Sequence, residues 1–234
     1  MAKHVGIVAC SAEGAALCYR TLCGEAPAEM GEYMHPEVTM HTHPLGEYIP
    51  HIRSGNWAAV AELMLSSARK LAAAGAEFII SPDNTIHEAY PLVVDASPIP
   101  WLHIAEAVAE EAETRGFRRL GITGAKYLME GPVYPDIFQK HGLAHEIPDE
   151  TARNGIDAIL FGELVNGVFK EESRLYLNEV IRALKERGCD AVVLGCTEIP
   201  LLVNAEDCPL PTLDSTRLLA RAALRYALKE ESNR

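Results

Sequence analysis

AGAEFIISPDNT (residues 74–85) and RGCDAVVLGCTE (residues 187–198) follow one pattern. In each stretch a glycine precedes a short apolar run, and a polar turn follows the run. The spacing from Gly75 to Gly188 equals the spacing from Asp83 to Cys196, so the two stretches align without a gap. The chain therefore contains an internal repeat, and Asp83 and Cys196 occupy equivalent places in its two copies.

The repeat extends to both sides of these stretches. Val5–Val8 resembles Leu120–Thr123, and Ile99–Leu102 resembles Leu210–Leu213. Duplicated half-domains commonly pair about a pseudo-two-fold axis, which makes their equivalent loops face each other across one cleft. We therefore expect an N-terminal half of residues 1–100 with 214–234, a C-terminal half of residues 101–213, and a cleft that brings Asp83 and Cys196 together.

Composition narrows the classes of protein to which the chain can belong. The 234 residues are 48% hydrophobic, which is enough for a sizeable core. The net charge of −12 argues against a surface that binds nucleic acid or an anionic membrane. No apolar run is long enough to span a bilayer. None of the six cysteines has the C-x-x-C spacing of a zinc or redox site, which favours a reducing cytoplasm.

Short apolar runs alternate with longer segments that have helical spacing. The runs are continuous rather than alternating, as in strands of a parallel sheet that is covered on both faces. The pattern predicts an α/β fold made of two pseudo-symmetric parallel-sheet halves. The expected strands are His4–Cys10, Glu77–Ser81, Trp101–Leu102, Arg119–Thr123, Leu143–Ile147 and Ala191–Leu194. The expected helices are Gly14–Leu22, Trp57–Ala74, Ile104–Arg115, Met129–His141, Ala152–Asn166, Glu172–Arg187 and Ser215–Lys229.

Ligands of open α/β sheets bind beyond the carboxyl ends of the strands. Four loops occupy that position, two from each half, and they are rich in Ser, Thr, Asn and Gly. Such loops suit a small polar ligand held by backbone N–H groups and hydroxyls. The four loops are Cys10–Gly14, Ser81–His87, Thr123–Tyr127 and Gly195–Glu198.

Cys196 and Asp83 are the candidate chemical groups, and each also has a plain structural interpretation. Cys196 follows a strand at a strand-to-helix turn, where a thiolate can be stabilised, but it could equally be a buried cysteine like Cys10 and Cys189. Asp83 could act as a base in a partly dry cleft, or it could cap a helix. The repeat favours function, because it sets the carboxylate opposite the thiol.

At these positions the chain resembles the aspartate/glutamate/hydantoin racemase superfamily, in particular its aspartate racemase and broad-specificity amino-acid racemase branch. The motif that carries the resemblance best is LGCTEIPLL at Leu194–Leu202. Supporting matches are Asp83–His87, Gly167–Lys170 and Leu213–Ala220, and the resemblance covers essentially the whole chain.

The resemblance implies a cofactor-free, metal-free isomerase that acts on a small amino acid or related carboxylate and forms a homodimer. Two acid/base residues, here Cys196 and Asp83, would work on opposite faces of the substrate Cα. The resemblance makes Lys170 the partner of the α-carboxylate. The other implied substrate-binding residues are Asn84, Thr85, Thr197, Ser11 and Thr123, and Glu198 and His87 flank the bases as candidate orienting groups.

The chain departs from the superfamily pattern in two places. The usual Cys-Asn-Thr of the first half is Asp83-Asn84-Thr85 here, so the two bases are unlike. A decarboxylase or isomerase of a small carboxylic acid with Cys196 as proton donor, and a non-catalytic amino-acid-binding protein, therefore stay open. Relatives selective for dicarboxylates carry an arginine near Met40–Tyr48. This segment has Glu47 and no arginine, so we expect aspartate not to be the best substrate.

Four histidines, His35, His41, His43 and His51, cluster loosely in the same part of the chain. A His-x-His pair can bind a metal, but no cysteine or carboxylate has a convincing ligand spacing with it. The sequence therefore favours a polar lid over a metal site.

Overall fold

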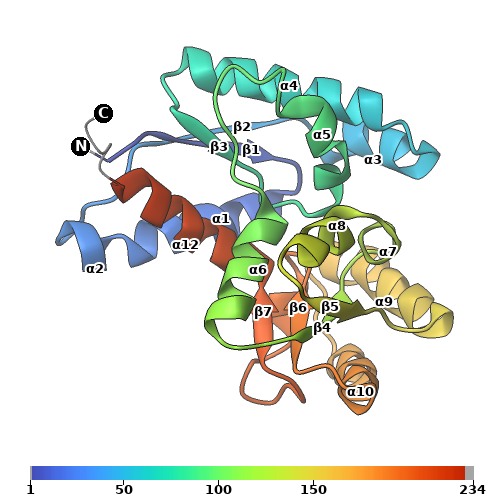
Figure 1. Cartoon of the computed structure of the whole chain (residues 1–234). Coiled ribbons are helices and arrows are strands. Elements are labelled where there is room, and N and C mark those ends of the chain that lie inside the picture. Colours follow the sequence, from blue (N-terminus) through green and yellow to red (C-terminus); the bar gives the residue numbers. More distant parts are fainter. Residues whose placement is uncertain (1, 230–234) are drawn as a thin grey trace. The chain divides into compact units, whose positions relative to one another are not determined.

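The chain divides into two compact units, which are described separately (Figure 1). The structure is a computed structural model that describes residues 2–229. Unit 1 is formed by the chain up to Ile104 together with the segment from Thr216 onward, and unit 2 is formed by Ala105–Ser215. The expectation of a parallel-sheet α/β fold with two sheets is confirmed.

Unit 1 contains a three-stranded parallel sheet in the order β2-β1-β3. Its strands are β1 (Val5–Ala9), β2 (Val38–Thr42) and β3 (Phe78–Ile80). The helices of this unit are α1 (Ala12–Glu25), α2 (Pro27–Met30), α3 (Leu45–Ser54), α4 (Trp57–Ala73), α5 (Tyr90–Val93), the 3-10 helix η1 (Thr85–Ala89) and α12 (Ser215–Leu228), whose first residue belongs to unit 2.

Strands β1 and β3 are buried on both faces, which explains their continuous apolar runs. Val8 and Ile79 pack into one core with residues of α3 and α4. Ile7 and Phe78 point to the other face, where they share a second core with residues of α1 and α12. Figure 1 shows α4 along one side of the sheet, and α1 with α12 along the other. Successive strand residues alternate between faces, so a strand covered on both sides needs apolar residues throughout.

Unit 2 contains a four-stranded parallel sheet in the order β5-β4-β6-β7. Its strands are β4 (Arg119–Thr123), β5 (Ala144–Glu146), β6 (Ala191–Leu194) and β7 (Thr212–Asp214). Its helices are α6 (Ile104–Thr114), α7 (Lys126–Glu130), α8 (Val133–Lys140), α9 (Glu150–Gly162), the 3-10 helix η2 (Leu164–Asn166), α10 (Glu171–Glu186) and α11 (Ile199–Leu202). The order β5-β4-β6 matches β2-β1-β3 of unit 1, as expected for a duplication.

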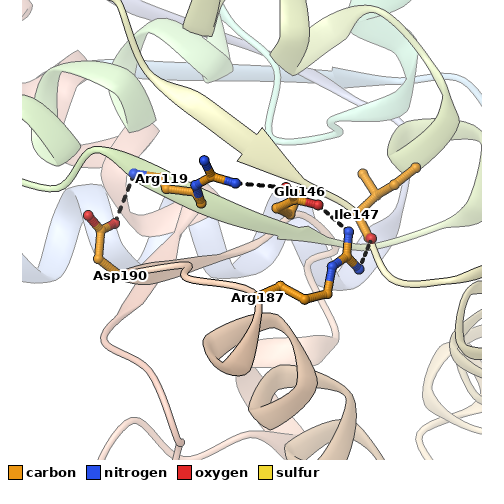
Figure 2. A network of polar contacts seen from close by, with 5 residues as sticks. All are labelled: Arg119, Glu146, Ile147, Arg187 and Asp190. Carbon is orange, nitrogen blue, oxygen red and sulfur yellow. Dashed lines mark hydrogen bonds and ion pairs between the residues drawn. The ribbon is translucent and has the colours of Figure 1, made fainter.

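A network of charged groups joins three strands of unit 2 (Figure 2). The Asp190 carboxylate accepts hydrogen bonds from the backbone N–H of Arg118 (2.7 Å) and of Arg119 (3.2 Å). Glu146 accepts from Arg119 Nη1 at 2.9 Å and also pairs with Arg187. The network binds the start of β4 to the end of β5 and the residue before β6. These ion pairs are partly exposed, so we expect each to contribute less than about 1 kcal/mol to stability.

Several expected elements differ from the structure. Strands β2 and β7 and helices α2 and α3 were not anticipated. Trp101–Leu102 is no strand, because only Trp101 forms a bridge, to Ile79. The expected helix Met129–His141 is divided into α7 and α8 at Gly131-Pro132. The other expected strands and helices lie within a few residues of their observed bounds.

Candidate active site

Asp83 lies in the loop that follows β3 at the carboxyl end of the unit 1 sheet. Its side chain is partly exposed between Pro82 and Asn84, which are buried. Its Oδ1 accepts a hydrogen bond of 3.3 Å from the backbone N–H of Ile86, inside the 3-10 helix η1. Asp83 therefore does have the capping role that was its structural interpretation. A cap of this kind uses one carboxylate oxygen, so it is compatible with a second role as a base.

His87 fixes the backbone of this loop. Its Nδ1 lies 2.8 Å from the carbonyl oxygen of Asp83, and its Nε2 lies 3.4 Å from the backbone nitrogen of Ile104. A carbonyl can only accept, so Nδ1 carries the proton and Nε2 accepts. Burial lowers the pKa of His87 to about 4, which keeps the ring neutral at pH 7. Through these two contacts His87 holds the Asp83 loop against the start of α6.

Tyr48 is a neighbour of Asp83 that the sequence did not indicate. Its side chain is fully buried, and its hydroxyl makes no hydrogen bond of normal geometry within residues 2–229, although Ser67 lies close to it. Burial raises the pKa of Tyr48, and the nearby Cys10 and Asp83 raise it further. The hydroxyl therefore stays protonated beside the Asp83 loop. Ser81 is also fully buried, and its Oγ finds no partner among the described residues.

The other expected residues of unit 1 lie at the same carboxyl edge. Ser11 caps α1, with its Oγ accepting from the backbone N–H of Gly14 at 3.3 Å. Asn84 is buried, with 3% of its surface exposed, and Thr85 is the partly exposed first residue of η1. The structure thus brings Ser11, Asp83, Asn84 and Thr85 to one end of one sheet.

Cys196 lies in the corresponding loop of unit 2, after β6, and a tight backbone contact positions it. The N–H of Gly195 donates to the carbonyl oxygen of Thr123 at 2.8 Å. A Cβ at Gly195 would lie 2.5 Å from Leu128 Cδ2 and 2.7 Å from that same carbonyl oxygen. Only glycine allows this approach, which leaves Cys196 partly exposed while Gly195 and Thr197 are buried.

A buried carboxylate lies directly behind the thiol. Glu198 is only 4% exposed, and its Oε2 accepts from Cys196 Sγ at 3.0 Å and from Thr197 Oγ1 at 2.7 Å. Glu198, expected only as a flanking orienting group, is thus in direct contact with the candidate catalytic thiol. Cys10 and Cys189 are buried, and burial raises the pKa of Cys189 to about 11, as is usual for structural cysteines.

Thr123 and Lys170, two further expected site residues, lie in opposite environments: Thr123 is buried and Lys170 is exposed. Thr123 is fully buried, and its Oγ1 donates to the carbonyl oxygen of Val193 at 2.7 Å, so it joins β4 to β6 beneath the Cys196 loop. Lys170 is an exposed residue just before α10, and its Nζ donates to Glu163 at 2.9 Å. A hydrogen bond from Ser173, with help from Lys170, lowers the pKa of Glu163 and keeps this carboxylate charged.

The described residues were also compared with the requirements of a metal site and of a membrane-spanning helix. Residues 2–229 contain no group of three His, Cys, Asp or Glu side chains arranged to hold a metal ion. His41 instead contacts Ser67 and Lys70, and His43 contacts Ser66 and Glu47. None of the described helices combines the length and the apolar character that crossing a membrane requires.

Comparisons with known proteins identify the family to which the chain is similar. The model of the Asp/Glu/hydantoin racemase family matches residues 7–223. A Yersinia pestis protein assigned to the Asp/Glu racemases has a crystal structure that is 33% identical, with a TM-score of 0.89 over 97% of this chain and 100% of that one. An aspartate racemase homologue from Pyrococcus horikoshii OT3 is 26% identical, with a TM-score of 0.84 over 98% and 100% of the two chains.

A curated relative of the chain is also a racemase. The broad specificity amino-acid racemase RacX of Bacillus subtilis (strain 168) is 21% identical over 174 residues, which are 72% of this chain and 73% of that protein. The family match spans both units and includes the Asp83 and Cys196 loops. The chain therefore belongs to the Asp/Glu/hydantoin racemase family.

Proposed function

We propose that the protein is a cofactor-independent amino-acid racemase or epimerase that uses Asp83 and Cys196 as opposed acid/base groups at the substrate Cα. Membership of the family supports amino-acid racemase activity, an isomerase reaction. The observation that carries the choice of residues is a shared pattern of exposure. In residues 81–84 only Asp83 is partly exposed, and in residues 195–199 only Cys196 is partly exposed. Thr85 is also partly exposed, but among the titratable side chains of the two loops only Asp83 and Cys196 are partly exposed, while His87 and Glu198 are buried.

The proposed chemistry needs one base and one acid. One group removes the α-proton, the other delivers a proton to the opposite face, and the configuration at Cα is inverted. Asn84, Thr85, Thr197 and Ser11 would bind the substrate through hydroxyls, amides and backbone groups. Lys170 would pair with the α-carboxylate after leaving Glu163. Thr123 would act indirectly, by holding the backbone beneath Cys196.

Hydrogen exchange in heavy water tests the proposal. Each L- and D-amino acid is incubated with the protein in D₂O, and both enantiomeric purity and deuterium at Cα are measured. A racemase inverts the substrate and places deuterium at Cα of the product. If no amino acid is inverted or exchanged, the racemase proposal is wrong.

One variant of each residue tests its role, and the Cys196 variant has a matched control. Asp83→Asn keeps an oxygen that can accept from Ile86 N–H, so it preserves the cap while it removes the base. We expect folding to be retained and racemisation to fall by roughly 10²–10⁴-fold. Cys196→Ala should abolish racemisation, whereas Cys208→Ala, at another partly exposed cysteine of the same unit, should leave it unchanged. Wild-type racemisation in Asp83→Asn would make Asp83 only a cap.

One alternative reaction has support from the site. A decarboxylase of a small carboxylic acid needs only a proton donor for the carbanion, and a thiol that donates to Glu198 suits that role. Release of carbon dioxide without inversion of any amino acid would favour this reaction. A non-catalytic amino-acid-binding protein would do neither, but ligand would raise its thermal stability.

We propose further that the protein acts as a homodimer in the cytoplasm. All six cysteines are free thiols, which suits a reducing compartment. Light scattering of the purified protein decides the oligomeric state, and fractionation of cells decides the compartment. A monomer at the concentration of the activity assay, or recovery outside the cytoplasm, would contradict this part of the proposal.

A further inference from the structure

The hydrogen bonds around Glu198 indicate which form of Cys196 the protein favours. Cys196 Sγ and Thr197 Oγ1 approach the same oxygen, Oε2 of Glu198, at 3.0 Å and 2.7 Å. An ionised carboxylate only accepts hydrogen bonds, and a thiol and a hydroxyl can both donate. The arrangement is therefore satisfied when Glu198 is ionised and Cys196 is protonated.

Ionisation of the thiol would break this arrangement. A thiolate at the same place would face a carboxylate oxygen 3.0 Å away, and the two negative charges would repel. Glu198 is 4% exposed, so water screens this repulsion poorly. Thr197 donates to the same carboxylate oxygen and limits its retreat.

We propose that Glu198 is a positioning residue that holds Cys196 as a protonated thiol and aims its proton donation. This inference rests on the proposed racemase function and assigns the resting roles within the pair: Cys196 is the acid, and Asp83 is the base. In the favoured direction the Cα–H bond breaks, its proton goes to the Asp83 carboxylate, and the carbanion takes the S–H proton of Cys196. The products of that step are an Asp83 carboxylic acid and a Cys196 thiolate, which exchange protons with water to return to the resting form.

The reverse direction needs the thiolate as base, which Glu198 disfavours. Two enantiomers have equal free energies, so kcat/KM must be equal in the two directions. Any asymmetry must therefore be visible as unequal kcat values that are balanced by unequal KM values. The unlike pair of bases can itself separate the two kcat values, so the readout that identifies Glu198 is the change of this split in a Glu198 variant, which a purely structural glutamate would not produce.

Alkylation of Cys196 by iodoacetamide tests the inference without depending on racemisation. Only the thiolate reacts, so the rate as a function of pH reports the ionisation of the thiol. In Glu198→Gln the charge is removed and the shape is kept. We expect the midpoint of the rate profile to move to lower pH. Alkylation at neutral pH should be roughly threefold faster for each pH unit of that movement, because a lower pKa gives more thiolate but makes it a weaker nucleophile. Racemisation should slow, and the kcat values of the two directions should become more alike.

The controls separate charge from damage to the fold. Glu179→Gln makes the same chemical change at an exposed ion pair with Arg182 and should leave both readouts unchanged. Cys196→Ala identifies the Cys196 peptide by mass spectrometry. Glu198→Asp keeps a carboxylate and should move the rate profile less than Glu198→Gln does. If the Gln variant folds poorly, the Asp variant is compared with the wild type instead, and a small shift to lower pH is expected.

Three results separate the possible errors. An unchanged or slower alkylation rate in a folded Glu198→Gln variant overturns the inference. Equal kcat values in the two directions of the wild type also overturn it. If alkylation responds as expected but the wild type racemises no amino acid, the proposed function fails while the contact between Glu198 and the Cys196 thiol stands.

Discussion

The close approach at Gly195 gives the sharpest prediction for a single methyl group. In Gly195→Ala, the added Cβ would meet Leu128 Cδ2 at 2.5 Å and the Thr123 carbonyl oxygen at 2.7 Å. The leucine side chain can move, but the carbonyl belongs to the backbone of β4 and also accepts the Gly195 N–H at 2.8 Å. The methyl group must therefore push β4 and the Cys196 loop apart and weaken this hydrogen bond.

The cost can be worked from these two effects. Overpacking a tight site costs about 1–3 kcal/mol, and a lost hydrogen bond costs about 1 kcal/mol. The expected loss is therefore about 2–4 kcal/mol, which for a chain of this size lowers Tm by roughly 4–16 °C. Because Cys196 is the next residue, racemisation should fall together with stability.

Thermal denaturation followed by circular dichroism measures this effect, and Gly162→Ala is the matched control. Gly162 is the last residue of α9, and a Cβ there would meet nothing within 4 Å. Alanine is favoured over glycine in a helix by roughly 0.5–1 kcal/mol, so the control should be as stable as the wild type or more stable. A Gly195→Ala protein as stable as Gly162→Ala would show that the loop does not constrain Cys196 as described.

Three further predictions concern other parts of the molecule. His141 lies between Glu106 (2.6 Å) and Glu113 (3.2 Å), and the hydrogen bond that its ring donates to Glu106 raises the pKa of His141. The stability that this contact adds is therefore present below about pH 6.5 and disappears as the pH rises through the raised pKa. Urea denaturation of His141→Gln should show a deficit near pH 6 that vanishes at high pH, and a deficit independent of pH would contradict this. Tyr48→Phe removes a buried hydroxyl that has no well-formed hydrogen bond. Urea denaturation should therefore show unchanged stability or a gain of up to about 1 kcal/mol. A loss above about 1 kcal/mol would reveal a hydrogen-bond partner of the Tyr48 hydroxyl. Glu47 would repel a second carboxylate, so L-aspartate should lose enantiomeric purity more slowly than the best neutral or basic amino acid, and the opposite order would refute this.

The elements that the sequence predicted well are those with strong local patterns. Arg119–Thr123 and Ala191–Leu194 were expected with the bounds that the structure shows, because each is a short apolar run between a glycine-capped turn and a polar loop. Strand β2 was missed because it lies at the edge of its sheet and alternates with polar residues. Helix α3 was missed because Pro50 lies inside it, and proline normally indicates a helix boundary.

The candidate site was only partly visible in the sequence. The repeat pointed to Asp83 and Cys196, because aligning the two copies of the duplication is enough to find positions that are equivalent to each other. The bond from Cys196 to Glu198 depends on the side-chain rotamers of two residues in one turn, and no sequence pattern specifies these. Tyr48 belongs to a segment that was interpreted as a polar lid, and its burial beside Asp83 depends on the packing of α3 against α4 and the sheet of unit 1.

The sheet of unit 1 is covered on one face by α12, which follows unit 2 in the sequence. Leu219, Ala220 and Ala223 of this helix share a core with Ile7 and Phe78, and the carbonyl of Ala227 accepts a hydrogen bond of 2.9 Å from Lys3 N–H. During synthesis, the β1 strand therefore leaves the ribosome roughly two hundred residues before the helix that covers it. Unit 2 is continuous and can be completed first, which reverses the usual N-terminal-first order of domain folding. Until α12 emerges, the apolar face formed by Ile7 and Phe78 is a surface that a chaperone would have to protect.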